Sequence, residues 1–128
     1  MRVENILTNQ RAFFNSNLTK DITFRVQQLK KLKAIIKDNE RLLYEAIYND
    51  FGKSEFETYA SELSLIYHEI NLAIKNIHKW SRIKNVSTGL ANFPAKSYIM
   101  PEPLGVTLII GAWNYPYQLS LVPSISAI

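Results

Sequence analysis

The chain has 128 residues, 47% of them hydrophobic and 20% charged, a balance that is typical of one globular domain and excludes a disordered chain. The formal net charge is +4, but the basic residues lie among helical apolar positions, so we expect solvated helix faces and no nucleic-acid binding. Cysteine is absent, which excludes disulfides, thiolate metal sites and a cysteine nucleophile within this chain.

Two segments of the chain bear on its location. The N-terminal residues lack the apolar core of a signal peptide, so a cytoplasmic location is expected. The longest apolar run, Leu104 to Trp113, reaches only about half of the length that a helix needs to cross a bilayer. We therefore expect no membrane insertion.

The first 84 residues predict a helical region. A short helix is expected from about Val3 to Asn15, with Ile6, Phe13 and Phe14 as its buried side chains. A long second helix is expected from about Asp21 to Phe51, followed by Gly52, a residue that suits a helix C-terminus. Its apolar stripe consists of Leu29, Leu32, Ile36, Leu43 and Ile47.

A third helix is predicted to begin at a capping box, in which Ser54 and Glu57 each satisfy a free backbone amide. Apolar residues then recur in steps of three and four, as in a helix that packs on another helix. This seam consists of Phe56, Tyr59, Leu63, Ile66, Ile70, Ala73, Ile77 and Trp80. His68 and His78 lie on the same helix without a metal-binding spacing, so they are expected at the surface and no metal site is predicted.

The remaining residues, 85–128, predict the start of an α/β domain. A connecting loop is expected up to Pro101, with a short edge strand from Ser97 to Met100. "LGVTLII", residues 104–110, is apolar and β-branched, like a parallel strand that is buried on both faces. Pro116 suits the first turn of a following helix, in which Pro123 would produce a kink or a break.

Charge is distributed unevenly along the chain. Glu102 is the last charged residue, and none occurs between Pro103 and Ile128. Soluble domains usually end in polar, exposed residues, and a buried parallel strand needs neighbouring strands and helices. The pattern therefore predicts an α/β fold that is truncated within a larger domain.

A Trp-Asn-Tyr-Pro turn joins this strand to this helix. With its surroundings, "EPLGVTLIIGAWNYPYQLSLVPSISAI", it resembles the start of the cofactor-binding domain in the aldehyde dehydrogenase superfamily, in the form typical of the class 3 enzymes for fatty and aromatic aldehydes. Residues 24–62, including the Asp-x-Gly-Lys turn at Asp50 to Lys53, are similar to the N-terminal helical pair of the same branch.

The resemblance implies the oxidation of aldehydes to carboxylic acids with NAD or NADP through a cysteine thiohemiacetal. Asn114 would donate a hydrogen bond to the oxyanion of that intermediate. The cofactor would lie against Ile110, Gly111, Ala112 and Trp113, and the substrate channel would include Tyr115, Leu119 and Tyr59. The family commonly forms homodimers. Its cysteine nucleophile and glutamate base match no residue of this chain, which implies that the 128 residues alone are inactive.

Each of these residues also has a structural interpretation. Asn is common in turns and as the N-cap of a helix, so Asn114 could cap the helix that follows it. Trp113 could be a core aromatic residue, and Tyr59 already occupies a position in the seam of the third helix.

Two other functions fit parts of the sequence. A helical interaction protein would use the seam of residues 56–80 to bind a partner. A membrane-surface protein would use the uncharged C-terminal segment as an anchor.

Overall fold

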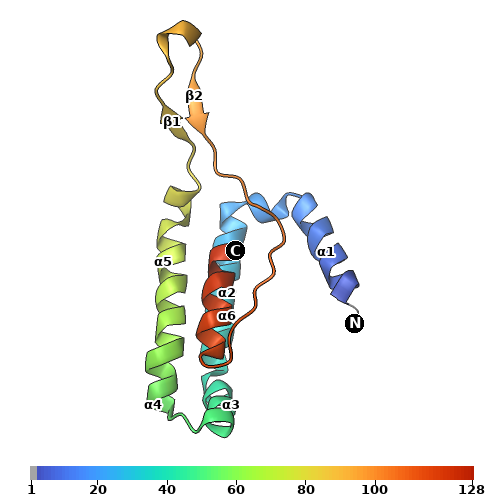
Figure 1. Ribbon diagram of the computed structural model, residues 1–128, viewed down its shortest axis with the longest axis vertical. Coiled ribbons are helices and arrows are strands. Elements are labelled where there is room, and N and C mark those ends of the chain that lie inside the picture. The colour runs from blue at the N-terminus through green and yellow to red at the C-terminus, as the bar shows by residue number, and fades with distance from the viewer. Residues whose placement is uncertain (1–2) are drawn as a thin grey trace.

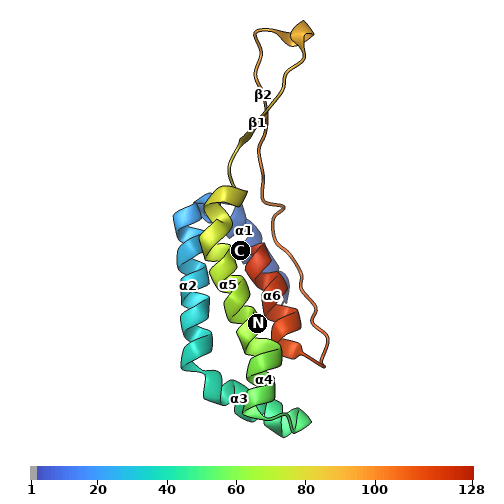
Figure 2. The same ribbon diagram turned by 90° about the vertical axis from the view of Figure 1, so that its left-hand side faces the viewer.

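The computed structural model describes residues 3–128, and helices dominate it. Helices α2, α5 and α6 lie side by side, and a thin hairpin of β1 and β2 projects beyond one end of them (Figures 1 and 2). The elements, in chain order, are α1 Val3–Asn15, η1 Leu18–Lys20, α2 Ile22–Asp38, α3 Glu40–Phe51, α4 Glu55–Thr58, η2 Tyr59–Leu63, α5 Ser64–Trp80, β1 Lys84–Val86, η3 Leu90–Asn92, β2 Ser97–Ile99 and α6 Pro116–Ala127.

The predicted second helix is two helices, so its prediction as one element was wrong. The helix is interrupted at Asn39, whose φ and ψ of −116° and 12° are not helical and whose side-chain amide donates to the Ile35 carbonyl over 2.7 Å. Asn competes with the helical backbone for such local hydrogen bonds, which explains the break. Gly52 ends α3 as predicted, with a φ of 69° that favours glycine.

The predicted third helix begins as expected but contains a wider turn. The Ser54 hydroxyl accepts a hydrogen bond from the Glu57 amide over 3.1 Å, which confirms Ser54 as the cap of α4. The reciprocal bond of the predicted capping box, from the Ser54 amide to the Glu57 side chain, does not occur among the described residues, so this half of the prediction was wrong. Residues 59–63 then form a π-helix, η2, between α4 and α5. Such a turn inserts an extra residue and rotates the segment before it relative to the segment after it.

The π-helix changes which side chains of this segment are buried. Thr58 and Glu62 are fully buried, whereas Phe56 and Tyr59 are 81% and 45% exposed. Trp80, at the other end of the seam, is also exposed. The predicted seam was therefore wrong at its two ends and right in its middle, from Leu63 to Ile77.

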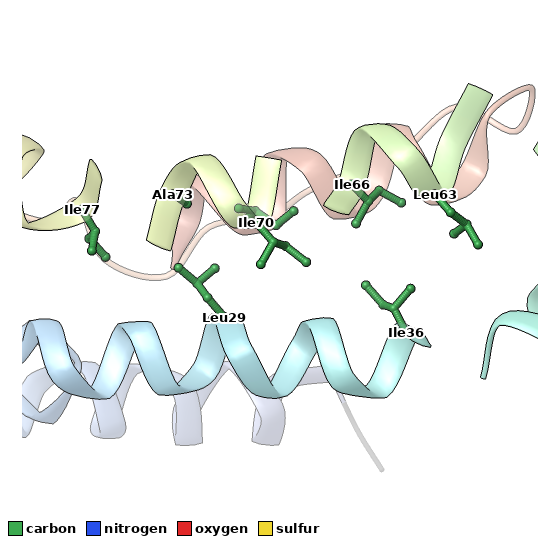
Figure 3. Close-up of a cluster of buried hydrophobic side chains, with 8 residues drawn as sticks. Leu29, Ile36, Leu63, Ile66, Ile70, Ala73 and Ile77 are labelled. Atoms are coloured by element: carbon green, nitrogen blue, oxygen red, sulfur yellow. The ribbon is translucent and has the colours of Figure 1, made fainter. Parts of the chain in front are cut away.

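The hydrophobic core lies where α5 contacts both α2 and α6 (Figure 3). Burial of these aliphatic side chains is the main favourable contribution to packing the three helices. The cluster consists of Leu29, Ile36, Leu63, Ile66, Ile70, Ala73, Ile77 and Ile125. The middle of the third-helix seam is thus buried within this chain.

Helix α1 contributes little to this core. None of its residues is buried: Ile6 and Phe13 are 40% and 43% exposed and Phe14 is only partly buried, so the predicted burial of these three side chains was wrong. Its contacts are peripheral, as in the pair formed by the rings of Phe13 and Phe24, whose centroids are 5.8 Å apart.

The segment predicted as a loop with one edge strand forms a hairpin. β2 pairs with β1 in antiparallel register, with Lys84 opposite Ile99 and Val86 opposite Ser97. The short strand at 97–100 is thus confirmed over Ser97–Ile99, and its partner β1 was not predicted.

Residues 104–110 are not a buried strand, and this prediction was wrong. Within the described residues they pair with no strand, and Leu104, Leu108 and Ile110 are 100%, 85% and 84% exposed. A parallel strand is stabilised by neighbours on both edges, and residues 3–128 supply none here.

Helix α6 begins at Pro116 as predicted and continues through Pro123 to Ala127, so the predicted break at Pro123 does not occur. Ile125 is its buried residue and packs in the core with α5.

Candidate functional site

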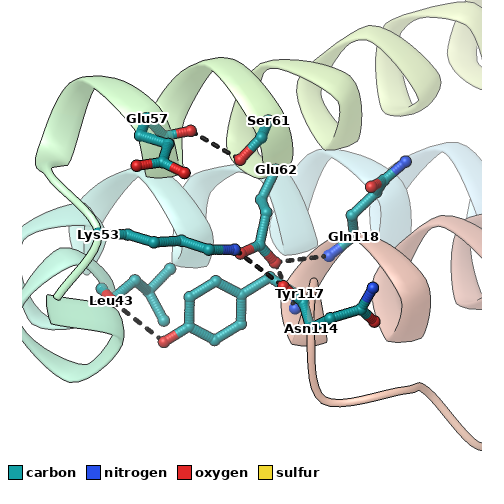
Figure 4. Close-up of polar contacts among 8 residues, drawn as sticks. All are labelled: Leu43, Lys53, Glu57, Ser61, Glu62, Asn114, Tyr117 and Gln118. Atoms are coloured by element: carbon teal, nitrogen blue, oxygen red, sulfur yellow. Dashed lines mark hydrogen bonds and ion pairs between the residues drawn. The ribbon is translucent and has the colours of Figure 1, made fainter. Parts of the chain in front are cut away.

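Asn114 lies in the turn that connects the extended segment to α6. Its side chain is exposed and points away from α4 and α5 in Figure 4. The described residues include no hydrogen bond from this side chain to another residue, so its amide is available to a ligand. Asn114 does not cap α6 either, because the N-cap residue is Tyr115, which makes no side-chain capping bond.

Lys53 holds the backbone of this turn. Its Nζ donates to the Asn114 carbonyl oxygen over 2.8 Å and lies 4.1 Å from the centre of the Tyr115 ring. An ammonium group over an aromatic face is attracted by the negative charge of that face. Lys53 follows the left-handed residue Gly52, so the end of α3 aims its side chain at the turn.

Glu62 satisfies the N-terminus of α6. Its Oε2 accepts hydrogen bonds from the amides of Tyr117 and Gln118, over 2.8 and 3.3 Å (Figure 4). The first amides of a helix have no partner within it, and their aligned dipoles favour a negative charge. A buried carboxylate from η2 thus serves α6 as a cap that no neighbouring residue provides.

Lys53 and Glu62 also form an ion pair. Lys53 Nζ lies 3.7 Å from Glu62 Oε1, and the two side chains are 14% and 0% exposed. This distance exceeds that of a hydrogen bond, and Oε1 has no hydrogen-bond partner among the described residues. The lysine charge compensates for burying the carboxylate, which would be costly if it were unpaired.

Tyr117 connects α6 to α3. Its hydroxyl donates to the Leu43 carbonyl over 3.2 Å. Burial, with the negative charges of Glu62 and Asp50, raises the pKa of the Tyr117 phenol, so this donor stays protonated.

The other predicted site residues surround the turn in part. Trp113 and Ile110 are 82% and 84% exposed, and Tyr115 lies against Lys53. Leu119 is partly exposed on α6. Tyr59 lies on η2, and among the described residues no hydrogen bond or ring contact connects it to Asn114.

Gly111 is held close to α6. A Cβ atom at this position would lie 2.6 Å from Ser120 Oγ and 3.2 Å from Ser120 N. Any side chain would push the segment away from the helix. The absence of a side chain at Gly111 therefore lets the extended segment pack directly against α6.

Two of the residues that hold the turn were not predicted. A step of four back from Ile66 reaches Glu62, so the apolar seam already indicated an inward-facing carboxylate. Lys53 gave no such signal beyond its place in the Asp-x-Gly-Lys turn, because its partners lie far along the chain.

The predicted surface position of the two histidines is confirmed, since His68 and His78 are exposed on α5. Over residues 3–128, no three His, Asp or Glu side chains gather closely enough to hold a metal ion. The helices of the same range include none that is both long and apolar enough to cross a membrane.

Comparison with known proteins identifies similar chains. The model of the family described as "Aldehyde dehydrogenase family" matches residues 2–128. The 4,4'-diaponeurosporen-aldehyde dehydrogenase of Staphylococcus aureus is 47% identical over 98% of this chain and 28% of its own length. Aldehyde dehydrogenase family 3 member H1 of Arabidopsis thaliana is 42% identical over 97% of this chain and 26% of its own length.

A solved structure shows the same fold. The structure titled "Substrate bound state of Staphylococcus Aureus AldH" superposes with a TM-score of 0.95 at 46% identity, covering 99% of this chain and 28% of that chain. The match is to the N-terminal part of that chain. This chain therefore spans about a quarter of the length of the curated relatives that it matches.

Proposed function

The chain belongs to the aldehyde dehydrogenase family, which oxidises aldehydes, and on this basis we propose that the polypeptide carrying it converts aldehydes to carboxylic acids with NAD or NADP. The observation that supports this proposal best is the Asn114 turn, where an unused amide side chain is displayed on a backbone that Lys53 and Glu62 anchor.

Asn114 would act when a thiolate adds to the aldehyde carbon. The carbonyl oxygen then becomes an oxyanion, and the Asn114 NH₂ group donates a hydrogen bond to it without becoming charged. The thiolate must come from a residue outside these 128, because this chain contains no cysteine, and we propose that the glutamate base lies outside them as well. The 128 residues alone should therefore show no turnover.

The cofactor would lie on the exposed segment formed by Ile110, Gly111, Ala112 and Trp113. When bound, NAD or NADP accepts the hydride that leaves the former aldehyde carbon. The division into a helical region, 1–84, and the start of a cofactor-binding domain, 85–128, stays a prediction, as do the homodimer and the cytoplasmic location.

The substrate proposed is an apolar aldehyde, aliphatic or aromatic. Trp113 and Tyr115 flank Asn114 in the chain and Leu119 lies near the start of α6; all three expose apolar surface, which favours such a ligand. The name of the Staphylococcus aureus relative, a 4,4'-diaponeurosporen-aldehyde dehydrogenase, agrees with this class.

The test begins with the intact mass of the protein purified from its source. A mass near 14.8 kDa would mean that these residues act alone, and no aldehyde-dependent formation of NADH or NADPH is then expected. For a larger polypeptide we expect such formation with aliphatic and aromatic aldehydes. Asn114→Ala should lower kcat by about 100-fold to 1,000-fold.

Asn92→Ala is the matched control, since Asn92 is also exposed but lies in the hairpin. It should retain the activity of the unmodified protein. A larger polypeptide that oxidises none of these aldehydes would show the proposed function to be wrong.

The non-catalytic alternative has less support. Leu63, Ile66 and Ile70, in the middle of its proposed interaction seam, are fully buried against the chain's own helices. A partner could reach them only if α2 or α6 were displaced.

A further inference from the structure

We propose that Lys53 and Glu62 are positioning residues that keep the Asn114 amide free for the substrate, an inference that rests on the proposed role of Asn114. They anchor the turn at the Asn114 carbonyl and in the first turn of the helix that follows it. Lys53 binds the Asn114 carbonyl, and Glu62 binds the amides of Tyr117 and Gln118, only a few residues further on.

The two anchors restrict different motions. The bond from Lys53 to the Asn114 carbonyl fixes the peptide plane that follows Asn114. The contact of Lys53 with the Tyr115 ring restrains the next side chain. Glu62 fixes the first turn of α6 against η2, because its buried carboxylate accepts hydrogen bonds from two backbone amides of α6.

The capping role of Glu62 explains why Asn114 remains unused. Asn is among the most favoured N-cap residues, and an uncapped helix offers its free amides to any nearby side-chain oxygen. Glu62 already occupies the amides of Tyr117 and Gln118. The Asn114 side chain therefore has no amide to bind at this helix end, and it points away from the pair in Figure 4.

Lys53 makes this arrangement possible. Glu62 is fully buried, and a buried carboxylate without a compensating charge is strongly unfavourable. Lys53 supplies that charge from 3.7 Å while its Nζ holds the turn itself. One cation thus couples the buried cap to the residue proposed to bind the oxyanion.

The experiment measures kcat and KM in the full polypeptide that carries this sequence. Glu62→Ala frees the amides of Tyr117 and Gln118, and we expect the Asn114 side chain to turn towards them. This displacement of the Asn114 amide should lower kcat by about 100-fold. Lys53→Met keeps the aliphatic stem but loses a charged hydrogen bond, which should lower kcat by about tenfold. KM for the cofactor should change by less than about threefold in both variants, because both act on the oxyanion step.

The decisive comparison uses Asn114→Ala as a second background. Glu62→Ala and Lys53→Met are proposed to act through Asn114, so in the Asn114→Ala background each should lower kcat by less than about twofold. A loss of folded protein would instead lower kcat by the same factor in both backgrounds, and that result would overturn the proposal. Glu62→Gln keeps an acceptor for the two amides, so its kcat should be about tenfold higher than that of Glu62→Ala.

Lys33→Met is the matched control, because Lys33 also joins two helices through a side-chain bond, to Asn71 over 2.8 Å, but lies away from the turn. It should leave kcat unchanged. If Asn114→Ala is impaired while Lys53→Met and Glu62→Ala keep full activity, the positioning role is wrong. If Asn114→Ala itself keeps full activity, the proposed function of Asn114 is wrong instead.

A crystal structure of Glu62→Ala tests the inference without any activity. We expect the Asn114 side chain to turn towards the free amides of Tyr117 and Gln118. An Asn114 side chain that stays in place in both Glu62→Ala and Lys53→Met would overturn the proposal.

Discussion

The N-termini of α2 and α6 meet the same requirement with residues from different places in the chain. At α2 the cap is the adjacent residue, Asp21, whose carboxylate accepts bonds from the amides of Thr23 and Phe24 over 3.0 and 3.3 Å. At α6 the adjacent residue Tyr115 provides no cap, and Glu62 reaches the helix from η2.

The difference lies in what each cap constrains. Asp21 is exposed and orders only its own helix end, and such a local cap contributes about 1 kcal/mol. Glu62 is buried and ties α6 to η2, so removing it disturbs both packing and the Asn114 turn. A local cap starts a helix, whereas a distant cap also fixes where the helix lies.

Glu62→Ala removes the distant cap of α6 and should have the largest effect on stability. It leaves the partly buried amides of Tyr117 and Gln118 and the charge of Lys53 without their partner, and we expect the free energy of unfolding to fall by about 3–5 kcal/mol. Urea denaturation of the full polypeptide measures this change. A loss no greater than that of Asp21→Ala would show that the buried cap has no special role.

The next effect concerns the segment that precedes α6. Gly111→Ala places a Cβ within 3.2 Å of the Ser120 backbone nitrogen, which cannot move without the helix. Overpacking of this kind should reduce the free energy of unfolding by about 1–3 kcal/mol.

Gly89→Ala is the control for Gly111→Ala, because a Cβ at Gly89 would meet no atom within 4 Å. Its unfolding free energy should change by less than about 0.5 kcal/mol. Equal urea midpoints for the two variants would contradict the close approach of this segment to α6.

A third variant, Tyr67→Phe, removes another carboxylate contact between distant segments, but one that does not cap a helix. The Tyr67 hydroxyl donates to Glu40, and its loss should cost about 1.5 kcal/mol at neutral pH. Burial, followed by the hydrogen bond to Glu40 and the charge of Glu40, raises the pKa of Tyr67.

The raised pKa of Tyr67 predicts a pH dependence. The unfolded chain loses this proton near pH 10, below the pH at which the folded protein does, so the stabilisation is complete below about pH 10 and declines above it. The difference in urea midpoint between the unmodified protein and Tyr67→Phe should therefore narrow above about pH 10. A difference that stays constant across this range would contradict the prediction.

The smallest effect is expected at the local cap. Asp21→Ala should lower the free energy of unfolding by about 1 kcal/mol, and Asp21→Asn, which keeps a capping oxygen, should lower it less. Thermal unfolding of both variants checks this order. The activity of Asp21→Ala should remain unchanged, in contrast to Glu62→Ala, because α2 does not carry the Asn114 turn.

Local signals predicted the elements whose determinants are adjacent in sequence. Ser54 before Glu57, Gly52 after α3 and Pro116 at the start of α6 each specify a helix end through their own backbone or side chain, and the structure confirms all three. Prediction failed where the outcome depends on distant residues. Residues 104–110 have the composition of a buried strand, but residues 3–128 provide no strand to pair with them.

The amino-acid sequence by itself determined the family, the middle of the helical core and the turn that displays Asn114, because these depend on short motifs and on apolar periodicity. The partners of this inward-facing carboxylate were decided by the tertiary structure alone: Glu62 caps α6, and Lys53 links it to Asn114. The physical reason is the π-helix η2, which rotates Glu62 towards an amide group that lies 55 residues away in the chain.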